Sequence, residues 1–503
     1  MEDGKWLEPH STVTYPFSKI LEPFWDVFMS QSLPRIIIAG TQSGTGKTSL
    51  SLALIASLKR KGLKVQTFKI GPDFLDPSYL TVASGRPCYN LDGWMTRKEY
   101  VLELFGRTTK DADIAVIEGV MGLFDGSDPG NSEGSTAEMA RWLDAPVLLV
   151  VNVHGMARSL SAIVKGCVEF ERDLKIAGVI ANHSGSDHHK DWLTQSLRSA
   201  SLPPLLGAIP RGALPTLPSR HLGLITADPQ NLPPRILENL ADVLEQILSV
   251  DTVTQIARNA SPLPITEPGL EAKPRLKRVS IGVAYDRAFH FYYPDNLDEL
   301  KLRGCNLILF SPLQDRKLPK DIDALYFGGG YPEEYAETLA ENREMQEAVR
   351  QFSKRGLPLY AECGGLMYLT QGIETTQEKR YPMVGLLPVW SRMLNRLKSL
   401  GYVEVTLTNK SLWGERGEVL RGHEFHYSEL AGPPQDDPLW TPVYRIKRRR
   451  SEKIFTEGFQ QNNVLASYVH LHWASQPRNV DTFINQCGAD PVRNAGVFTT
   501  PFP

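Results

Sequence analysis

The chain has 503 residues, of which 42% are hydrophobic and 22% are charged, and these proportions are typical of a soluble globular protein with two or three domains. Its formal net charge of -2 gives no electrostatic reason to expect nucleic acid or an anionic membrane as a partner. No stretch approaches about 18 consecutive apolar residues, so no membrane-spanning helix is expected. The 5 cysteines form no CxxC pair, which argues against a disulfide framework or a zinc site and favours a cytoplasmic location.

Residues 1–34 form an N-terminal extension that carries acidic residues among prolines. After it, short apolar runs alternate with segments of helical pattern, such as residues 48–60. The strand candidates are residues 35–39, 64–70, 114–117, 147–151 and 176–180. This alternation predicts a parallel sheet covered by helices on both faces, in a first domain that spans residues 35–250.

Residues 251–277 contain several prolines and few aromatic residues, which predicts a linker between domains. The alternation then restarts and predicts a second α/β domain over residues 278–503. Its expected strands are residues 279–284, 307–310, 324–327 and 357–360, and its expected helices include 296–302 and 344–354. A short basic run at residues 445–450 is expected to be solvated surface.

The first strand leads directly into a glycine-rich loop, Gly40-Thr-Gln-Ser-Gly-Thr-Gly-Lys-Thr48, which opens a helix. Glycines let backbone N–H groups curve around phosphate oxygens, and the helix N-terminus adds positive potential. The pattern predicts an ATP site in which Lys47 contacts the β- and γ-phosphates and the Thr48 hydroxyl binds Mg²⁺. The strict Walker spacing would place glycine where this chain has Thr41. The loop residues expected around the phosphates are Gly40, Thr41, Gly44, Gly46, Lys47 and Thr48.

Charged side chains follow two of the predicted strands. Lys69, Asp73 and Asp76 come after the second strand, and Glu118 ends the strand that begins at Ile114. Ligands bind at the carboxyl ends of strands in open α/β sheets, so these carboxylates are candidate Mg²⁺ ligands, directly or through water. The alternative for Asp73 and Asp76 is that each only begins a turn.

The segment Leu357-Pro-Leu-Tyr-Ala-Glu-Cys-Gly-Gly-Leu-Met-Tyr-Leu369 has the form strand, tight turn, helix. Small residues around Cys363 permit the sharp turn that projects a nucleophile. At a helix N-terminus the thiolate is expected to be stabilised, which would lower the pKa of this cysteine.

A base for the thiol must come from elsewhere in the chain. Ser467-Tyr-Val-His-Leu-His-Trp473 offers His470 and His472, and spacing alone does not choose between them because both would lie on one face of a strand. The glycines after Phe327 could supply backbone N–H groups from Gly328 and Gly329 as an oxyanion hole. The alternative for this segment is a simple turn.

Many segments, in order along the chain, resemble the cobyrinic acid a,c-diamide synthases of cobalamin biosynthesis. The resemblance spans residues 35–485. It rests on GTQSGTGKT, FKIGPDFLDPSYL, NLDGWM (90–95), VIEGVMGLFDG, GAIPR (207–211), LPSRHLGL (217–224), FHFYYPDNL (289–297), YFGGGYPEEY (326–335), AECGGLMYL, GHEFHYS (422–428) and SYVHLHW. The first half is also similar to dethiobiotin synthetase, whose loop keeps one extra residue. The second half resembles flavodoxin-like class I glutamine amidotransferase domains of the cobyric acid synthase type.

The resemblance implies roles for individual residues. Lys47 and Lys69 would contact the transferring phosphate, Thr48 and Glu118 would hold Mg²⁺, and Asp73 and Asp76 would assist metal or intermediate binding. His470 aligns with the catalytic base. Ordinary class I domains carry a triad Glu two residues after that histidine, where this chain has His472, so a dyad of Cys363 and His470 is expected.

The implied reaction is ATP-dependent phosphorylation of the a and c acetates of cobyrinate, followed by displacement of phosphate by ammonia from L-glutamine. Free ammonia could replace glutamine. The resemblance leaves hydrogenobyrinate or a nickel sirohydrochlorin open as substrates, and it is compatible with a homodimer. A ParA/MinD-like switch ATPase is the alternative from another class. It predicts a second loop lysine near Gly40, where this chain has Thr41 and Gln42, and it leaves the second domain unexplained.

Overall fold

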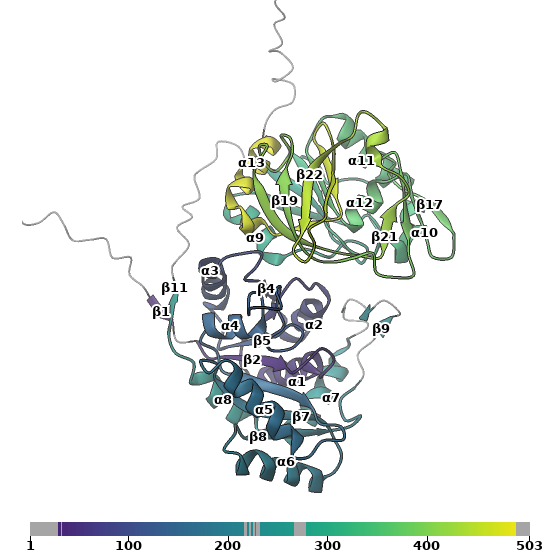
Figure 1. The fold of residues 1–503 in the computed structure, drawn as a ribbon. Helices are drawn as coiled ribbons and strands as arrows, with labels where there is room; N and C mark the ends of the chain where they lie inside the picture. Colours follow the sequence, from purple (N-terminus) through teal and green to yellow (C-terminus); the bar gives the residue numbers. More distant parts are fainter. Residues whose placement is uncertain are drawn as a thin grey trace, which may run out of the picture.

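The computed structural model describes residues 29–31, 33–215, 219–220, 223–224, 227, 232–265 and 278–488. The chain forms two α/β lobes, one coloured purple to teal and the other green to yellow in Figure 1. Most of the predicted N-terminal extension, the second half of the predicted linker and part of the LPSRHLGL segment lie outside the described residues. No helix in the described part of the chain is long and apolar enough to cross a membrane.

The first lobe is built on a sheet of seven parallel strands, as the alternation of apolar runs predicted. Its spatial order is β4-β3-β5-β2-β6-β7-β8. The strands are β2 (Arg35–Gly40), β3 (Val65–Ile70), β4 (Tyr89–Leu91), β5 (Ile114–Glu118), β6 (Val147–Asn152), β7 (Ile176–Ser184) and β8 (Leu205–Pro210). The β4 edge lies nearest the second lobe (Figure 1).

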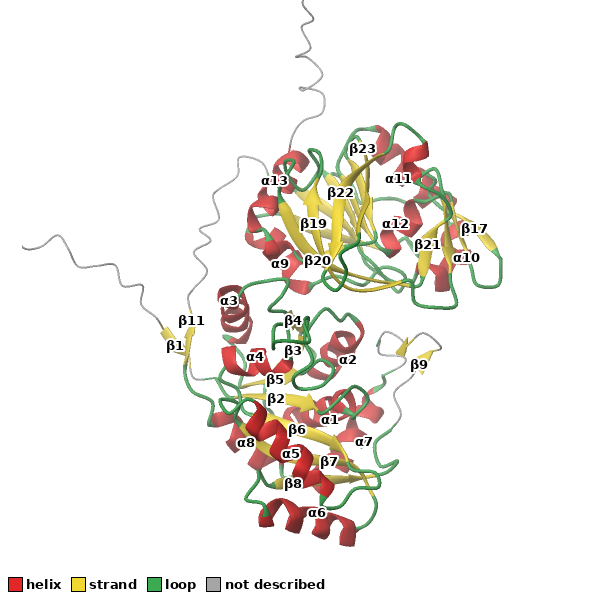
Figure 2. Cartoon of the chain, viewed as in Figure 1, coloured by secondary structure: helices red, strands yellow, loops and turns green. Residues whose placement is uncertain are grey.

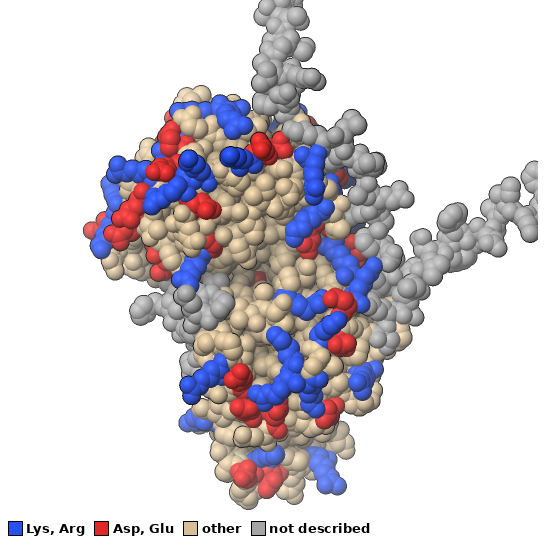
Figure 3. Space-filling model, turned by 180° about the vertical axis from the view of Figure 1, so that it is seen from behind, with Lys and Arg blue, Asp and Glu red and all other residues tan. Residues whose placement is uncertain are grey.

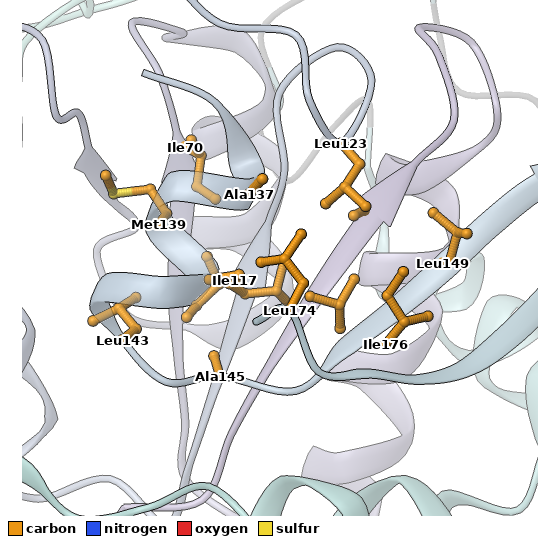
Figure 4. Close-up of a cluster of buried hydrophobic side chains, with 14 of the residues drawn as sticks. Ile70, Ile117, Leu123, Ala137, Met139, Leu143, Ala145, Leu149, Leu174 and Ile176 are labelled. Carbon is orange, nitrogen blue, oxygen red and sulfur yellow. The ribbon is translucent and has the colours of Figure 1, made fainter. Parts of the chain in front are cut away.

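Helices cover both faces of this sheet (Figure 2), because side chains along each strand alternate between two apolar cores. Ile36 and Ile38 enter one core, whereas Ile37 and Ala39 enter the other. The first core includes residues of α1 (Lys47–Arg60), α2 (Leu75–Ser84), α7 (Pro234–Ile247) and α8 (Val250–Arg258). The second includes residues of α3 (Lys98–Thr109), α4 (Thr136–Trp142), α5 (Ser159–Phe170) and α6 (Asp187–Ser199). Figure 4 shows part of this second core, with Met139 of α4 near strand residues such as Ile117.

The second lobe contains a ten-stranded mixed sheet of order β13-β12-β14-β15-β24-β23-β22-β19-β20-β25. The segment from β13 to β24 is parallel and the remainder is antiparallel. The strands are β12 (Ser280–Ala284), β13 (Asn306–Phe310), β14 (Ala324–Phe327), β15 (Leu359–Glu362), β19 (Ser399–Leu407), β20 (Val419–His426), β22 (Thr441–Arg448), β23 (Ile454–Gln461), β24 (Val464–Ser467) and β25 (His470–Leu471). The apolar runs predicted the β12 to β15 region only.

Five α-helices accompany this sheet within residues 278–488: α9 (Pro294–Leu302), α10 (Ala336–Glu341), α11 (Arg343–Lys354), α12 (Gly364–Leu369) and α13 (Pro477–Gly488). A four-stranded sheet lies beside them. Its strands are β16 (Gly372–Glu374), β17 (Arg380–Pro382), β18 (Trp390–Met393) and β21 (Ser428–Leu430).

The segment that was predicted to be a linker, because of its prolines, begins with regular structure. Helix α8 extends to Arg258, and β11 (Leu263–Ile265) pairs with β1 (Met29–Gln31). The buried guanidinium of Arg35 donates to the carbonyls of Leu143 and Ser261 and so holds this segment against the first lobe. Proline is compatible with such a two-stranded edge, because an edge strand needs few backbone donors.

The basic run at residues 445–450 is not simply solvated surface, contrary to the expectation from sequence. The guanidinium of Arg449 lies 2.6 Å from the carboxylate of Glu133, and that of Arg450 donates to the carbonyl of Gly126 at 2.6 Å. Both partners belong to the first lobe. The run therefore joins the two lobes, which its charge alone could not reveal.

Candidate active sites and the contact between them

The glycine-rich loop connects β2 to α1 in a left-handed backbone conformation at two positions. Gly44 has φ 76° and Gly46 has φ 96°, values that residues with a Cβ adopt rarely. A Cβ at Gly46 would also lie only 2.4 Å from Nδ2 of Asn182. The Asn182 amide donates to the carbonyl of Thr45 at 2.8 Å, so strand β7 fixes the shape of the loop.

This loop borders a cavity of about 730 Å³ at the carboxyl ends of the strands, a volume in the usual range for a small-molecule site. Lys47, Thr48, Lys69 and Asn182 are among its lining residues. The Lys47 ammonium donates to the carbonyls of Met121 at 2.6 Å and Gln42 at 3.2 Å. Burial and the charge of Lys69 hold the pKa of Lys47 below its ordinary value, so a phosphate oxygen would be a favourable partner for this cation.

Lys69 joins the predicted carboxylates into one cluster around its buried ammonium. Its ammonium lies 2.6 Å from Asp76 and 2.8 Å from Glu118, and 4.0 Å from Asp73. Burial opposes the charge, but Asp76 and Glu118 keep the pKa of Lys69 above its ordinary value. Burial and the neighbouring Asp76 raise the pKa of Asp73 to about 8. The turn alternative also holds for Asp73, which accepts from the backbone N–H of Leu75 at 2.8 Å.

The donor set of this cluster fits Mg²⁺. The Thr48 hydroxyl donates to Oε1 of Glu118 at 2.8 Å, and Oε2 of Glu118 is buried without a hydrogen bond among the described residues. Mg²⁺ in nucleotide sites takes one or two protein oxygens and completes its shell with phosphate and water. A closed cage is not required. The described part of the chain contains no group of three or more His, Cys, Asp or Glu arranged as a metal site.

Cys363 occupies the predicted sharp turn between β15 and α12. Its backbone has φ 46° and ψ −101°, a strained conformation of the kind that presents nucleophiles. The lowered thiol pKa expected from the helix N-terminus is wrong. Burial, with a contribution from the carboxylate of Glu333, raises the pKa of Cys363, and the N–H of Gly364 opposes this only in part. The thiol therefore needs a base.

His470 and His472 have different partners, although spacing could not separate them. The His470 ring stacks on His423 with centroids 4.9 Å apart and abuts the glycine turn, since a Cβ at Gly329 would lie 2.4 Å from its Cε1. That turn contacts α12, because Gly365 N–H donates to the Gly328 carbonyl at 3.0 Å. His472 instead lies 3.2 Å from the buried carboxylate of Asp295. His470 is thus the histidine that packs on the glycine turn, and that turn contacts the start of α12.

The two N–H groups predicted for an oxyanion hole are already engaged. Gly328 donates to the hydroxyl of Tyr292 at 2.7 Å, and Gly329 donates to the carbonyl of Phe291 at 3.2 Å. These contacts shape the turn and leave neither group free to bind an oxyanion. The next residue contacts the start of α12, because a Cβ at Gly364, which follows Cys363, would lie 3.0 Å from the nitrogen of Gly330.

The two candidate sites meet through Phe74, which lies between Asp73 and Asp76 in the chain. Its ring centroid is 5.0 Å from that of His470 and 5.2 Å from that of Phe291. A loop of the first lobe that carries cavity carboxylates therefore packs on the histidine of the second lobe. No local pattern around Phe74 could have indicated this contact.

Polar contacts surround Phe74 at the junction of the lobes. They are Tyr89–Asp298 at 2.8 Å, Tyr100–Asp295 at 2.7 Å, Arg107–Glu299 at 3.0 Å, Tyr402–Asp92 at 2.7 Å, and the guanidinium of Arg421 to the carbonyl of Trp94 at 2.8 Å. The motifs at residues 90–95 and 289–297 also meet in space, because the Tyr293 hydroxyl donates to the sulfur of Met95 at 3.7 Å. The sequence-based prediction also missed Asn182. Its position near the carboxyl end of a buried apolar strand was a usable signal, because ligands bind at that edge of the sheet.

A phosphate loop on a parallel sheet and a cysteine turn on a second α/β sheet define a glutamine amidotransferase ligase. Residues 36–225 match the CobQ/CobB/MinD/ParA nucleotide binding domain, and residues 280–478 match the CobB/CobQ-like glutamine amidotransferase domain. The chain belongs to the cobyrinate a,c-diamide synthase family.

Similarity to members of this family extends over most of the chain. This chain is 54% identical to the cobyrinate a,c-diamide synthase of Syntrophotalea carbinolica, over 91% of this chain and 99% of the relative. It is 46% identical to that of Leptospira interrogans, with the same two coverages. It is 42% identical to that of Priestia megaterium, over 90% of this chain and 97% of the relative.

Proposed function

We propose that this protein uses ATP and glutamine to convert the a and c acetate carboxylates of cobyrinate into amides. The observation that carries the proposal is the contact between the two sites. Phe74, flanked by Asp73 and the Lys69-bound Asp76, packs on His470 at 5.0 Å between ring centroids. Ammonia released beside His470 would therefore have a short way to the site where a carboxylate is activated.

In the first lobe, the loop N–H groups and Lys47 bind the ATP phosphates, and Lys69 stabilises negative charge on the transferring phosphoryl group. Thr48, Asp73 and Glu118 would hold Mg²⁺, which supplies electrostatic stabilisation of the phosphates when bound. An acetate oxygen of the macrocycle attacks the γ-phosphorus of ATP, the bond to the β-phosphate oxygen breaks, ADP leaves, and an acyl phosphate remains. Ammonia then attacks the acyl carbon, phosphate leaves, and the amide remains.

In the second lobe, His470 removes the thiol proton of Cys363, which attacks the side-chain amide of glutamine. We place the oxyanion near the N–H groups of Gly364 and Gly330, since those of Gly328 and Gly329 have other acceptors. The Phe74 ring and its aromatic neighbours keep water from the ammonia, which must stay unprotonated to react. We also propose a cytoplasmic location, because a sparse set of 5 cysteines without a CxxC pair is typical of a reducing compartment.

The decisive experiment substitutes the nucleophile and supplies either nitrogen source. We expect Cys363→Ala to abolish amide formation from glutamine and to retain it with high free ammonia, because only the glutaminase step is lost. The mono- and diamide products are measured by mass spectrometry with ATP and cobyrinate, and in parallel with hydrogenobyrinate. Cys487→Ala, which changes another buried cysteine of the same lobe, is the matched control and should keep both activities. Unchanged glutamine-driven synthesis in Cys363→Ala would refute the proposal.

A further inference from the structure

Glu362 directly precedes Cys363 at the end of β15, and its side chain is buried. Its Oε2 atom lies 3.8 Å from Nδ1 of His470. That ring nitrogen is itself buried and has no hydrogen-bond partner among the described residues. Leaving a buried polar atom without a hydrogen bond is costly, so the unsatisfied nitrogen facing a carboxylate calls for a functional explanation.

Three donors hold the Glu362 carboxylate in this place. Oε1 accepts from the Tyr360 hydroxyl at 2.8 Å and from the Leu471 N–H at 3.1 Å, and Oε2 accepts from the Tyr326 hydroxyl at 3.0 Å. Donors of this kind favour the ionised carboxylate. Because Leu471 follows His470, the same carboxylate also fixes the segment that carries the imidazole.

The opposite edge of the His470 ring faces the glycine turn at residues 328–330. A Cβ at Gly329 would lie 3.2 Å from Nε2 of His470, and the same turn contacts α12, which begins after Cys363. A base that has a carboxylate at Nδ1 and the nucleophile on the Nε2 side has the arrangement of a catalytic triad. Such hydrogen bonds are often long without substrate and shorten in the reacting complex.

We propose that Glu362 is the positioning residue of the glutaminase base: its carboxylate keeps the proton of neutral His470 on Nδ1 and stabilises the imidazolium. This inference rests on the roles proposed above for Cys363 and His470. It replaces the dyad expected from the sequence with a triad. The third member comes from the residue before the nucleophile, whereas His472 occupies the position two residues after the base.

Each proton that moves during glutamine hydrolysis has a donor and an acceptor. The thiol proton of Cys363 moves to Nε2 of His470 while sulfur bonds to the amide carbon of glutamine and the carbonyl electron pair moves to oxygen. When the C–N bond breaks, the nitrogen takes the proton from Nε2 and leaves as ammonia. Water then hydrolyses the thioester to glutamate and the free thiol. Glu362 stays ionised and transfers no proton.

Several titratable groups surround this pair and bear on its pH dependence. They are Tyr292, Tyr293, Tyr326, Tyr360, Tyr444 and His472 around Glu362, His423 and His426 around His470, and Glu333 and Glu424 near the thiol. The phenols have pKa values raised by burial and stay neutral. Burial lowers the pKa of His423 to about 3 and also lowers that of His470. Burial raises the pKa of Glu362 to about 7, so the ionisation of Glu362 falls near neutral pH.

The test compares Glu362→Gln with Glu457→Gln in the full-length protein. Glu457 is a matched control, because it is a buried Glu in the same sheet that accepts from the Ser467 hydroxyl and from the Tyr468 N–H at 2.7 Å, just before His470. We expect Glu362→Gln to lower the glutaminase kcat by about 10²- to 10⁴-fold and to move the acid limb of its pH profile below about 7. Ammonia-driven synthesis should stay within about twofold, which shows that the variant folds.

Each outcome separates this inference from the proposed function. Glu457→Gln is expected to keep the wild-type glutaminase pH profile, and Glu362→Asp should restore part of the lost rate. The inference is overturned if Glu362→Gln keeps both the rate and the profile, or if Glu457→Gln shifts the profile equally. If Cys363→Ala or His470→Asn retains glutamine-driven synthesis, the proposed function itself fails, whatever Glu362→Gln shows.

Discussion

Glu362 and Glu457 are buried carboxylates of the second lobe, and both have pKa values raised by burial. For Glu457 the pKa rises to about 8, although the Ser467 hydroxyl and the Tyr468 N–H oppose the shift. A carboxyl group whose pKa is higher in the folded than in the unfolded protein stabilises the fold at low pH. That stability is complete below the ordinary pKa of Glu and is lost as the pH rises towards 8.

We therefore predict that Glu457→Gln makes the free energy of unfolding less dependent on pH. Between about pH 4.5 and 8, the wild-type protein should lose at most about 1.4 kcal/mol per pH unit more than the variant, because glutamine does not titrate. Denaturant unfolding of both proteins across this range measures the difference. Glu362 and Asp73 titrate in both proteins, so their contributions cancel. Parallel pH dependences would show that Glu457 is ionised in the folded state throughout.

At the scale of elements, the turn between β15 and α12 depends on how closely its backbone approaches β14. A Cβ at Gly365 would lie 2.5 Å from the carbonyl oxygen and 2.7 Å from the Cβ of Phe327. Backbone atoms can move only at the expense of the strand, unlike the end of a flexible side chain. The small residues of this turn thus set the distance between the nucleophile and the glycine turn at residues 328–330.

Gly365→Ala is predicted to lower the melting temperature and to reduce glutaminase activity more than ammonia-driven synthesis. Overpacking at such a contact typically costs about 1–3 kcal/mol. Gly166→Ala provides the matched control, because Gly166 is an exposed position in helix α5 with open space around its Cβ direction. Alanine there should instead stabilise by about 0.5–1 kcal/mol. Calorimetry of both variants would contradict this account if Gly365→Ala were as stable as Gly166→Ala.

At the scale of the whole molecule, the lobes share an aromatic cluster enclosed by polar contacts. Trp94, Met95 and Tyr293 form its core, with Phe74 and Tyr402 packed against them. On the outer face seen in Figure 3, basic and acidic side chains are interspersed over both lobes. Exposed ion pairs contribute little to holding two surfaces together. We therefore direct the prediction for the whole molecule at the aromatic cluster between the lobes.

Phe74→Ala should uncouple glutamine hydrolysis from amide formation. Loss of the ring opens the space beside His470, so that more ammonia escapes or is protonated before it reaches the acyl phosphate. We expect the ratio of glutamate released to amide formed to rise severalfold, while synthesis from free ammonia changes little. Phe170→Ala, at an exposed position of α5, is the control and should leave the ratio unchanged. An unaltered ratio in Phe74→Ala would argue against a sealed contact.

Features that depend on local order could be predicted from the amino-acid sequence. The phosphate loop, the cysteine turn and the run of parallel strands were predictable because glycine placement and apolar periodicity act over a few residues. The antiparallel strands from β19 to β23 were not predicted, since they are half-exposed and lack continuous apolar runs.

The pairing of the functional groups, in contrast, became visible only in the folded chain. Folding of the second lobe brings Glu362 to His470 across 108 residues of sequence. Packing of the two lobes brings Phe74 to the same ring. In the folded chain the N–H groups of Gly328 and Gly329 donate to other acceptors, and burial raises the pKa of Cys363. Such effects depend on distance and desolvation in three dimensions, which the spacing of residues along a chain does not encode.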